Sequence, residues 1–252
     1  MEEEKQVEKA KKSFESILLN DKYSNIIGDD QHLSLLLSMI SLKAGDTLLD
    51  VGTGAGYLAF PLAQSRSDCQ IIGLDIAGRV MEQNQKKAEE EGISNIRFQA
   101  FDGMHYPSME KISMITTRYA FHHFPDAAMV VRQWADLLCD SGRVLVADPI
   151  RNEQDHDRII DRFMEIKGDG HIGFYTEKEM KDLFAEYGMQ SIRSEITSMH
   201  FPFPKKQEYL ELFETLSEEE KAMYQMTEKD GVVWVGHIDV GNLLLEKRVS
   251  NS

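Results

Sequence analysis

Asp50-Val51-Gly52-Thr53-Gly54-Ala55-Gly56 stands at the end of an apolar run and directly before a helical pattern. Glycines at such a place let the backbone turn tightly and approach a ligand, while the following helix offers free N–H groups. A dinucleotide fingerprint would have glycine or alanine at position 57, where this chain has Tyr57, and the lysine of a P-loop is also missing. The turn therefore predicts a small ligand other than a pyrophosphate or triphosphate. Asp50, at the strand end, favours a ligand that carries an ammonium group.

Short apolar runs alternate with helical stretches after this turn. The strand candidates are Thr47–Val51, Ile71–Leu74, Ile96–Ala100, Ile112–Thr116 and Val144–Ala147. Alternation of this kind predicts a parallel sheet with crossover helices. The last crossover is expected to be a helix that starts at Pro125-Asp126 and ends at the turn Asp140-Ser141-Gly142.

The chain beyond Asp148 is less regular. Thr176 and Glu179 predict a capping box, and Gly188 predicts the end of that helix. Three further strands are expected, near Gln190–Ser198, Val232–Ile238 and Leu243–Lys247. The stretch from Pro202 to about Asp230 contains a predicted helix and looks inserted, so we interpret it as a lid or subdomain.

Composition limits the possible partners. The 252 residues are 42% hydrophobic, enough to bury a sizeable core. Lys and Arg total 28 against 43 for Asp and Glu, a formal charge of −15 that disfavours nucleic acid and anionic membranes. No signal-peptide pattern is present, so a cytoplasmic protein is expected. Cys69 and Cys139 lack metal-site spacing and are expected to be buried thiols, with no metal site.

Acidic residues also end the two strands that follow the glycine turn along the chain. Asp75 follows Ile71-Ile72-Gly73-Leu74, where a carboxylate suits a ribose diol. Asp102 follows Ile96–Phe101, where it suits an adenine amino group, and Ile76 and Met104 are available to sandwich the ring. Three acids at the carboxyl ends of successive strands predict one nucleoside site at the binding edge of the sheet.

These motifs together resemble those of the class I S-adenosylmethionine-dependent methyltransferases. Within them the chain is most similar to the small-molecule group of quinone-biosynthesis type (methyltransferase type 11/25). The resemblance runs from about Leu33 to Gly188. The segments that carry it are Leu49–Gly56, Asp75, Asp102-Gly103-Met104, Arg118–Asp126 and Ser141–Asp148. Ser113 departs from the Asp that many relatives have there, a residue that is usually structural.

The resemblance implies a Rossmann-like, doubly wound α/β fold. We expect a mostly parallel, seven-stranded sheet with an antiparallel edge strand. An N-terminal helical cap, with helices over residues 3–20 and Asp30–Ile40, is predicted to occupy residues 1–40. The methyltransferase domain then covers residues 41–252, with the lid insert at about 200–238.

S-adenosyl-L-methionine is the implied cofactor. The residues expected to bind it are Asp50, Gly52, Gly54, Gly56, Asp75, Ile76, Asp102, Gly103, Met104, Arg118 and His123. Methyl transfer to a hydroxyl, amine or activated carbon that must lose a proton needs a base. His122, just after the fourth strand, is the candidate base, and Asp148, at the end of the fifth, is expected to orient it or to act instead. In some relatives a histidine and an acid at such positions do this work.

Two other readings stay open at this level. One is a nicotinamide-dependent oxidoreductase, which Tyr57 and Asp102 disfavour. The other is a non-catalytic protein that binds S-adenosylmethionine, which the aromatic and histidine content of Arg118–Phe124 disfavours. A small-molecule acceptor is the expected partner. Whether carbon, oxygen or nitrogen is methylated is left open, and so is a homodimer.

Overall fold

The computed structural model describes residues 11, 29–101, 106 and 111–248. The helix expected over residues 3–20 lies outside this part except for Lys11. Asp102, Gly103 and Met104 also lie outside the described residues.

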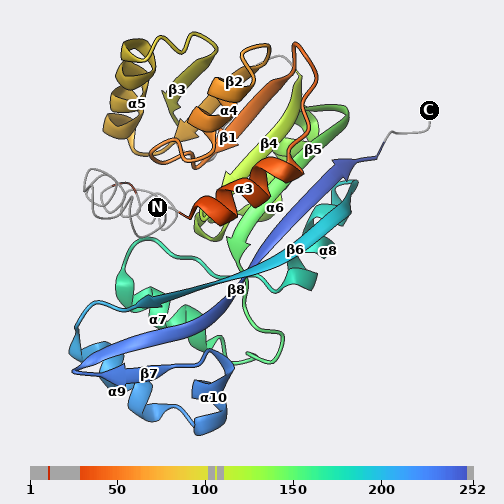
Figure 1. The fold of residues 1–252 in the computed structure, drawn as a ribbon. Coiled ribbons are helices and arrows are strands. Elements are labelled where there is room, and N and C mark those ends of the chain that lie inside the picture. The colour runs from red at the N-terminus through yellow and green to blue at the C-terminus, as the bar shows by residue number, and fades with distance from the viewer. Residues whose placement is uncertain (1–10, 12–28, 102–105, 107–110, 249–252) are drawn as a thin grey trace.

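A single twisted sheet forms the centre of the molecule (Figure 1). Its order is β3-β2-β1-β4-β5-β8-β6, and a short strand, β7, pairs with β8. The strands are β1 Thr47–Val51, β2 Gln70–Asp75, β3 Ile96–Ala100, β4 Ile112–Arg118, β5 Leu138–Pro149, β6 Met189–Pro202, β7 Thr227–Lys229 and β8 Val232–Lys247. Strands β3, β2, β1, β4 and β5 are parallel, and β8 runs antiparallel to both of its main neighbours. The Rossmann-like fold class is confirmed, with the antiparallel strand β8 one place inside the edge strand β6.

Helices cover both faces of the sheet, as a doubly wound fold requires. Successive residues of a strand face opposite sides, so Leu48 and Leu49 of β1 enter two different hydrophobic clusters. The first cluster includes side chains of α3 (Asp30–Met39), α4 (Ala59–Ser65) and α5 (Gly78–Glu90). The second includes side chains of α6 (Ala127–Leu137) and α8 (Glu177–Glu186). The helix predicted over Asp30–Ile40 is α3.

The predicted turn at Asp140-Ser141-Gly142 is wrong. Helix α6 ends at Leu137, and these residues already belong to β5, which starts at Leu138. Pairing with β4 shifts register between Ile112 and Met114, and Ser141 has a φ of 59°. The residues that were expected to form a turn therefore lie in an irregular part of strand β5.

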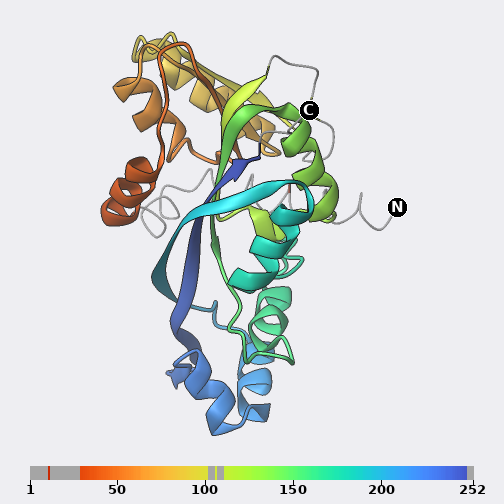
Figure 2. The same cartoon turned by 90° about the vertical axis from the view of Figure 1, so that its right-hand side faces the viewer.

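Val232–Ile238 and Leu243–Lys247 were expected to be two strands and are one, β8, of 16 residues. Val240 of β8 pairs with Pro149, the last residue of β5. Residues 232–239 of β8 therefore continue beyond the carboxyl end of β5, and β6 follows them to Pro202. The two strands form a long arm (Figure 2).

A third hydrophobic cluster surrounds the far end of this arm. It joins α7 (Ile159–Lys167), α9 (Gln207–Thr215) and α10 (Glu218–Met223) to the outer ends of β6 and β8 (Figure 1). We call these elements, with β7, the arm subdomain. Because the arm extends past the carboxyl end of β5, the subdomain lies on the side of the sheet where parallel α/β folds bind ligands. No helix in the described ranges is both long and apolar enough to cross a membrane.

Candidate functional site

The glycine turn after β1 adopts a backbone that side chains would obstruct. Gly52, Gly54 and Gly56 have φ values of 71°, 52° and 81°. A Cβ atom on Gly52 would stand 2.4 Å from the Cβ of Ala120, and one on Gly56 would stand 2.5 Å from the Phe60 ring. The turn therefore packs closely against Ala120, in the segment that follows β4, and against Phe60 of α4, so the packing of the protein itself requires glycine at these two positions.

Asp75 joins the end of β2 to this turn. Its Oδ2 accepts the N–H of Gly54 at 2.8 Å, and its Oδ1 accepts the N–H of Ala77 at 3.0 Å. Each carboxylate oxygen has a second lone pair that can accept a ribose hydroxyl. Burial raises the pKa of Asp75. Ile76 follows directly, so both predicted residues lie beside the turn.

Asn84 is a residue of this region that the sequence analysis missed. Its Nδ2 donates to the carbonyl oxygen of Gly54 at 2.8 Å, which fixes the turn from α5. Asn84 is buried beside Val80, Met81 and Ala88 on the inner side of α5. A polar residue on an otherwise apolar helix face was the available signal.

Asp50 is buried under the turn. It accepts the hydroxyl of Thr116 on β4 at 2.6 Å, and its residue is 3% exposed. Burial raises its pKa to about 6. A carboxylate that is removed from water gains most from a cationic partner, and the ammonium group expected of its ligand stays a prediction.

Arg118, at the end of β4, is held between two aromatic rings. Its Cζ lies 3.8 Å from the centroid of Tyr57 and 4.0 Å from that of Tyr119. Tyr119 has a φ of 55°, a strained conformation for a bulky residue. The Tyr57 hydroxyl donates to the carbonyl oxygen of Asp29, just before α3.

Helix α3 is also fixed from its other side. Nε2 of His32 lies 2.7 Å from Oδ1 of Asn242 on β8, and both residues are buried. The sequence analysis gave no role to His32 and used Tyr57 only to exclude a dinucleotide. Neither contact leaves a local pattern, because the partners lie far apart in the chain.

His122 and Asp148 meet at the ends of β4 and β5. His122 belongs to the short helix η1 (Phe121–His123), and its Nδ1 lies 2.8 Å from Oδ2 of Asp148. The same oxygen accepts the backbone N–H of His122 at 3.1 Å. Burial raises the pKa of Asp148 to about 8, and burial also lowers the pKa of His122 well below its usual value. The structure thus brings the candidate base and its proposed partner into direct contact.

Two further imidazoles adjoin this pair. The ring centroid of His123 lies 4.1 Å and that of His171 lies 5.3 Å from the His122 ring. Burial lowers the pKa of His123 to about 3. His171 was missed in the sequence, where the glycines around it in Gly168-Asp169-Gly170-His171-Ile172-Gly173 were the only signal. Among the described residues, no group of three or more His, Cys, Asp and Glu side chains could hold a metal ion.

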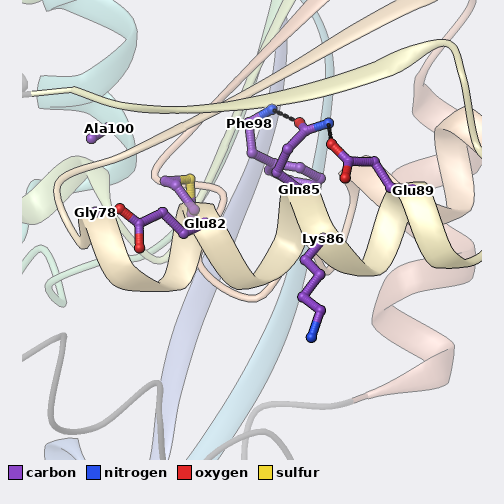
Figure 3. A pocket seen from close by; sticks show the side chains of 8 residues that line it. Gly78, Glu82, Gln85, Lys86, Glu89, Phe98 and Ala100 are labelled. Carbon is purple, nitrogen blue, oxygen red and sulfur yellow. Dashed lines mark hydrogen bonds between the residues drawn. The ribbon is translucent and has the colours of Figure 1, made fainter.

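A shallow groove of about 450 Å³ runs along α5 and β3 (Figure 3). It is lined by Gly78, Met81, Glu82, Gln85, Lys86, Glu89, Phe98 and Ala100. Its end at Gly78 adjoins the Asp75 segment, and the rest follows the helix away from the sheet edge. None of the predicted cofactor-binding or catalytic residues lines this groove, so it is not the candidate site.

Comparison with known proteins agrees with this geometry. A family profile described as "Methyltransferase domain" matches residues 42–231. The chain is 28% identical over 166 residues to the uncharacterized methyltransferase YcgJ of Bacillus subtilis, covering 64% of this chain and 63% of YcgJ, slightly less than two thirds of that relative. It is 28% identical over 205 residues to the 27-O-demethylrifamycin SV methyltransferase of Amycolatopsis mediterranei, covering 76% of this chain and 73% of that protein.

A third relative and two solved structures are similar as well. The ubiquinone biosynthesis O-methyltransferase of Serratia proteamaculans is 32% identical over 123 residues, covering 47% of this chain and 50% of that protein. The crystal structure of YcgJ superposes with a TM-score of 0.76 at 22% identity, covering 88% of this chain and all of that one. A putative methyltransferase of Bacillus halodurans superposes with a TM-score of 0.78 at 20% identity, covering 87% and 100%. The chain belongs to the class I S-adenosylmethionine-dependent methyltransferases.

Proposed function

We propose that this protein transfers a methyl group from S-adenosylmethionine to a small-molecule acceptor by in-line displacement. One observation carries the proposal. The buried acids Asp50 and Asp75 at the glycine turn, and the His122–Asp148 pair, stand on the same carboxyl edge of the sheet, on β1, β2, and the ends of β4 and β5. That edge combines a cofactor cradle with a proton-accepting pair.

The residues of the cradle fit the cofactor. Gly52, Gly54 and Gly56 give the turn its positive φ values, and Gly52 and Gly56 let it pack against Ala120 and Phe60; we propose that the backbone shaped in this way receives the methionine part. Asp50 would hold its ammonium group and Asp75 its ribose hydroxyls, with Ile76 against the adenine. Asp102, Gly103, Met104, Arg118 and His123 complete the proposed set by resemblance. The cofactor supplies an electrophilic methyl group, and the protein has to hold the acceptor in line with it.

His122 is the proposed base, oriented by Asp148. Between the lowered pKa of His122 and a pH of about 8 both side chains are neutral, because burial raises the pKa of Asp148 to about 8 and lowers that of His122. Above it, the ionised Asp148 accepts the Nδ1–H of His122, and the lone pair of Nε2 is then free to take a proton from the acceptor. The active form of the pair therefore increases with pH.

The arm subdomain and α3 are the proposed cover of the site. Exclusion of water favours a reaction in which a charged nucleophile and a sulfonium neutralise each other. The subdomain stands beyond the carboxyl end of β5, and α3 contacts the glycine turn through Tyr57 and β8 through His32. The contacts of α3 support the described part of the predicted cap, and the position of the subdomain supports the lid at about 200–238, as parts of the site.

A hydroxyl is the acceptor group that we favour, because two relatives carry the names of O-methylating enzymes. The net charge of −15 supports a small molecule over nucleic acid. We also propose a cytoplasmic location. A homodimer is a further proposal, which light scattering tests.

Calorimetry with S-adenosylmethionine, S-adenosylhomocysteine and NAD tests the cofactor first. Both adenosyl compounds should bind and NAD should not. Asp75→Asn should weaken the binding of S-adenosylmethionine at least tenfold, which corresponds to about 1.4 kcal/mol of binding free energy, since it removes a charged acceptor from the ribose site. Asp68→Asn, at an exposed ion pair with Arg66, is the control. Binding of NAD alone would instead support the oxidoreductase reading.

A methyl-transfer assay with labelled donor against hydroxyl, amine and carbon acceptors then tests the reaction. His122→Ala should lower turnover at saturating acceptor while cofactor binding is kept. Undiminished turnover would remove His122 from the mechanism. Cofactor binding without transfer to any acceptor class would favour a non-catalytic binding protein.

A further inference from the structure

The segment Gly168–Phe174 lies directly on η1, the short helix that carries His122. The N–H of Ile172 donates to the carbonyl oxygen of His122 at 3.0 Å, and the N–H of Gly173 donates to the same oxygen at 3.4 Å. The side chain of His123 hydrogen-bonds the backbone of Gly170. The segment therefore contacts both histidines of η1 through its main chain.

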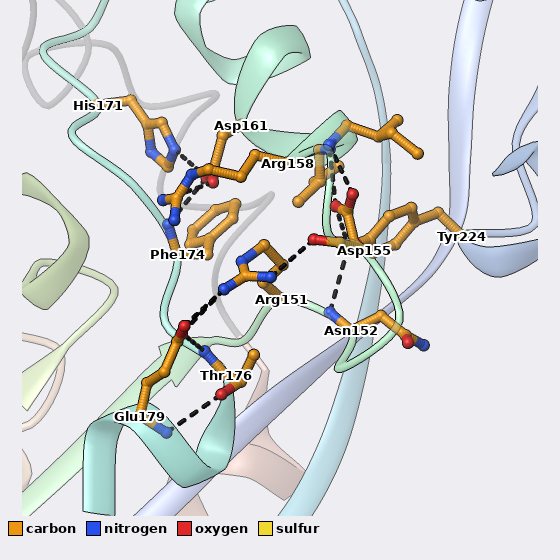
Figure 4. Close-up of polar contacts among 12 residues, drawn as sticks. Arg151, Asn152, Asp155, Arg158, Asp161, His171, Phe174, Thr176, Glu179 and Tyr224 are labelled. Atoms are coloured by element: carbon orange, nitrogen blue, oxygen red, sulfur yellow. Dashed lines mark hydrogen bonds and ion pairs between the residues drawn. The ribbon is translucent and has the colours of Figure 1, made fainter. Parts of the chain in front are cut away.

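Asp161 on α7 holds this segment in place (Figure 4). Its Oδ1 contacts Nε2 of His171 at 2.7 Å and accepts the N–H of Phe174 at 2.8 Å. Its Oδ2 lies 2.8 Å from the guanidinium of Arg158. Burial opposes ionisation of Asp161, but these hydrogen bonds outweigh it and lower the pKa. The ionised Asp161 makes Nε2 of His171 the donor.

Aromatic rings from the segment then enclose His122. The Phe174 ring centroid lies 4.8 Å from the His122 ring and 4.6 Å from the His171 ring. His171 lies 5.3 Å from His122. With Asp148 bound to Nδ1, these neighbours leave His122 only 6% exposed.

We infer that His171 and Asp161 are positioning residues for the methyl-transfer site: they fix the Gly168–Phe174 segment on η1, so that the His122 imidazole stays bound to Asp148 and shielded from bulk water. The inference rests on the proposed role of His122 as base. It gives a function to His171, a buried histidine outside η1. It also ties the base to the arm subdomain, because Asp161 belongs to α7, which is part of that subdomain.

The groups that face His122 come from three elements and one loop. They are Asp148 from β5, His123 on η1, Lys167 and Asp161 on α7, and Asp169 and His171 in the segment. The charges of the two residues changed in the test act on His122 in opposite directions, since His171 lowers and Asp161 raises the pKa of His122. A rise in that pKa in both variants therefore reports the loss of the segment and not the loss of one charge. Loss of the segment should admit water to His122 and return its titration toward the usual midpoint of about 6.5.

The test is an NMR pH titration of the imidazole nitrogens, with the His122 signal assigned by its loss in His122→Gln. Wild type should show no His122 titration between about pH 5 and 7. His171→Leu and Asp161→Asn should each move the titration of His122 into the range of about pH 5 to 7. His171→Gln keeps an amide donor near the position of Nε2 and should behave as wild type. His237→Asn, in the half-exposed His237–Asp239 pair (2.9 Å), is the matched control.

Unchanged His122 titration in folded His171→Leu and Asp161→Asn would overturn the inference. If neither variant folds, amide exchange in the wild type decides: Ile172 should exchange at least a hundredfold more slowly than an unprotected amide, and protection below tenfold contradicts the inference. Calorimetry with S-adenosylmethionine distinguishes failure of the positioning role of His171 and Asp161 from failure of the proposed function. Absence of binding in wild type would refute the function, whereas the two variants should still bind S-adenosylmethionine, because Asp50, Asp75 and the glycine turn are unchanged in them. With an acceptor identified in the methyl-transfer assay, the kcat of His171→Leu and of Asp161→Asn should be at least tenfold below that of wild type. His171→Gln should have the kcat of wild type.

Discussion

Gly52 is the residue at which the turn tolerates least change. Alanine there must adopt a φ of 71° and place its Cβ 2.4 Å from Ala120. Gly92 offers a matched control, because its φ is 70° and a Cβ would meet nothing within 4 Å. Gly92→Ala therefore measures the backbone strain alone, about 1–2 kcal/mol.

Gly52→Ala should lower the free energy of unfolding by more than Gly92→Ala does, and it should abolish binding of S-adenosylmethionine. Urea denaturation and calorimetry give the two values. Equal losses of stability in both variants, with cofactor binding intact, would mean that Ala120 moves aside and that the close approach does not matter.

Asp148 makes the free energy of unfolding depend on pH. Its pKa is about 8 in the folded state against 3.8 in the unfolded chain, so between these values the folded state holds a proton that the unfolded chain has lost. This contribution to stability is complete below about pH 4 and is lost as pH rises through 8. His122 has the opposite slope, because its lowered pKa makes the unfolded chain the better proton binder below 6.5.

The difference in unfolding free energy between wild type and Asp148→Asn isolates the carboxyl group. It should shift in favour of the variant as pH rises from about 4 to 8, measured by urea denaturation at a series of pH values. A difference that does not change with pH would show that Asp148 ionises alike in both states. Methyl transfer by wild type should rise through the same apparent pKa of about 8.

At the scale of elements, α3 depends on a distant strand. His32 contacts Oδ1 of Asn242, and the Nδ2 of Asn242 donates to the carbonyl oxygen of Glu195 and the hydroxyl of Thr197 on β6. Helix α3 is thereby bound to both β8 and β6. Its N-terminal end meets the glycine turn through Asp29 and Tyr57.

His32→Leu should lower the free energy of unfolding by about 1–3 kcal/mol, because it leaves the buried Asn242 oxygen without that hydrogen bond. It should also weaken the binding of S-adenosylmethionine several-fold, because α3 is then held less firmly beside the glycine turn. Chemical denaturation and calorimetry measure these changes against Gln31→Ala, at the exposed neighbouring position. Cofactor affinity equal to wild type would limit α3 to a role in stability.

Across the whole molecule, Tyr224 links the arm subdomain to the segment after β5. Its hydroxyl donates to Oδ2 of Asp155 at 2.7 Å and accepts the N–H of Asn152 at 3.2 Å (Figure 4). Asp155 also accepts the first N–H groups of α7, from Ile159 and Ile160. One buried carboxylate, in the segment after β5, therefore joins Tyr224 to the start of α7 within the arm subdomain.

Tyr224→Phe should lower the free energy of unfolding by about 1–3 kcal/mol, since Asp155 and the N–H of Asn152 stay in place but lose the hydroxyl as hydrogen-bond partner. Hydrogen exchange should become faster in α7, α9 and α10 while β1 and β4 keep their protection. Tyr187→Phe, at the half-buried C-terminal end of α8, is the comparison. Uniform acceleration over the whole sheet would show that the subdomain does not open separately.

The sequence by itself determined the parallel strands, the glycine turn and the capping box of α8. Each of these depends on residues within a few positions of one another: strand periodicity, positive φ at glycine, and the Thr176–Glu179 pair. The order of acids along the chain also indicated the binding edge, because carboxyl ends of parallel strands share one side of a sheet.

Only the tertiary structure decided what lies around that edge. Asp239 to Asn242 reads locally as a break, yet pairing with β5 on one side and β6 on the other keeps β8 continuous through it. Asp161, His171 and Asn242 acquire their roles from partners on other elements. A hydrogen bond between distant residues leaves no periodicity in the sequence, since its geometry exists only after the core has packed.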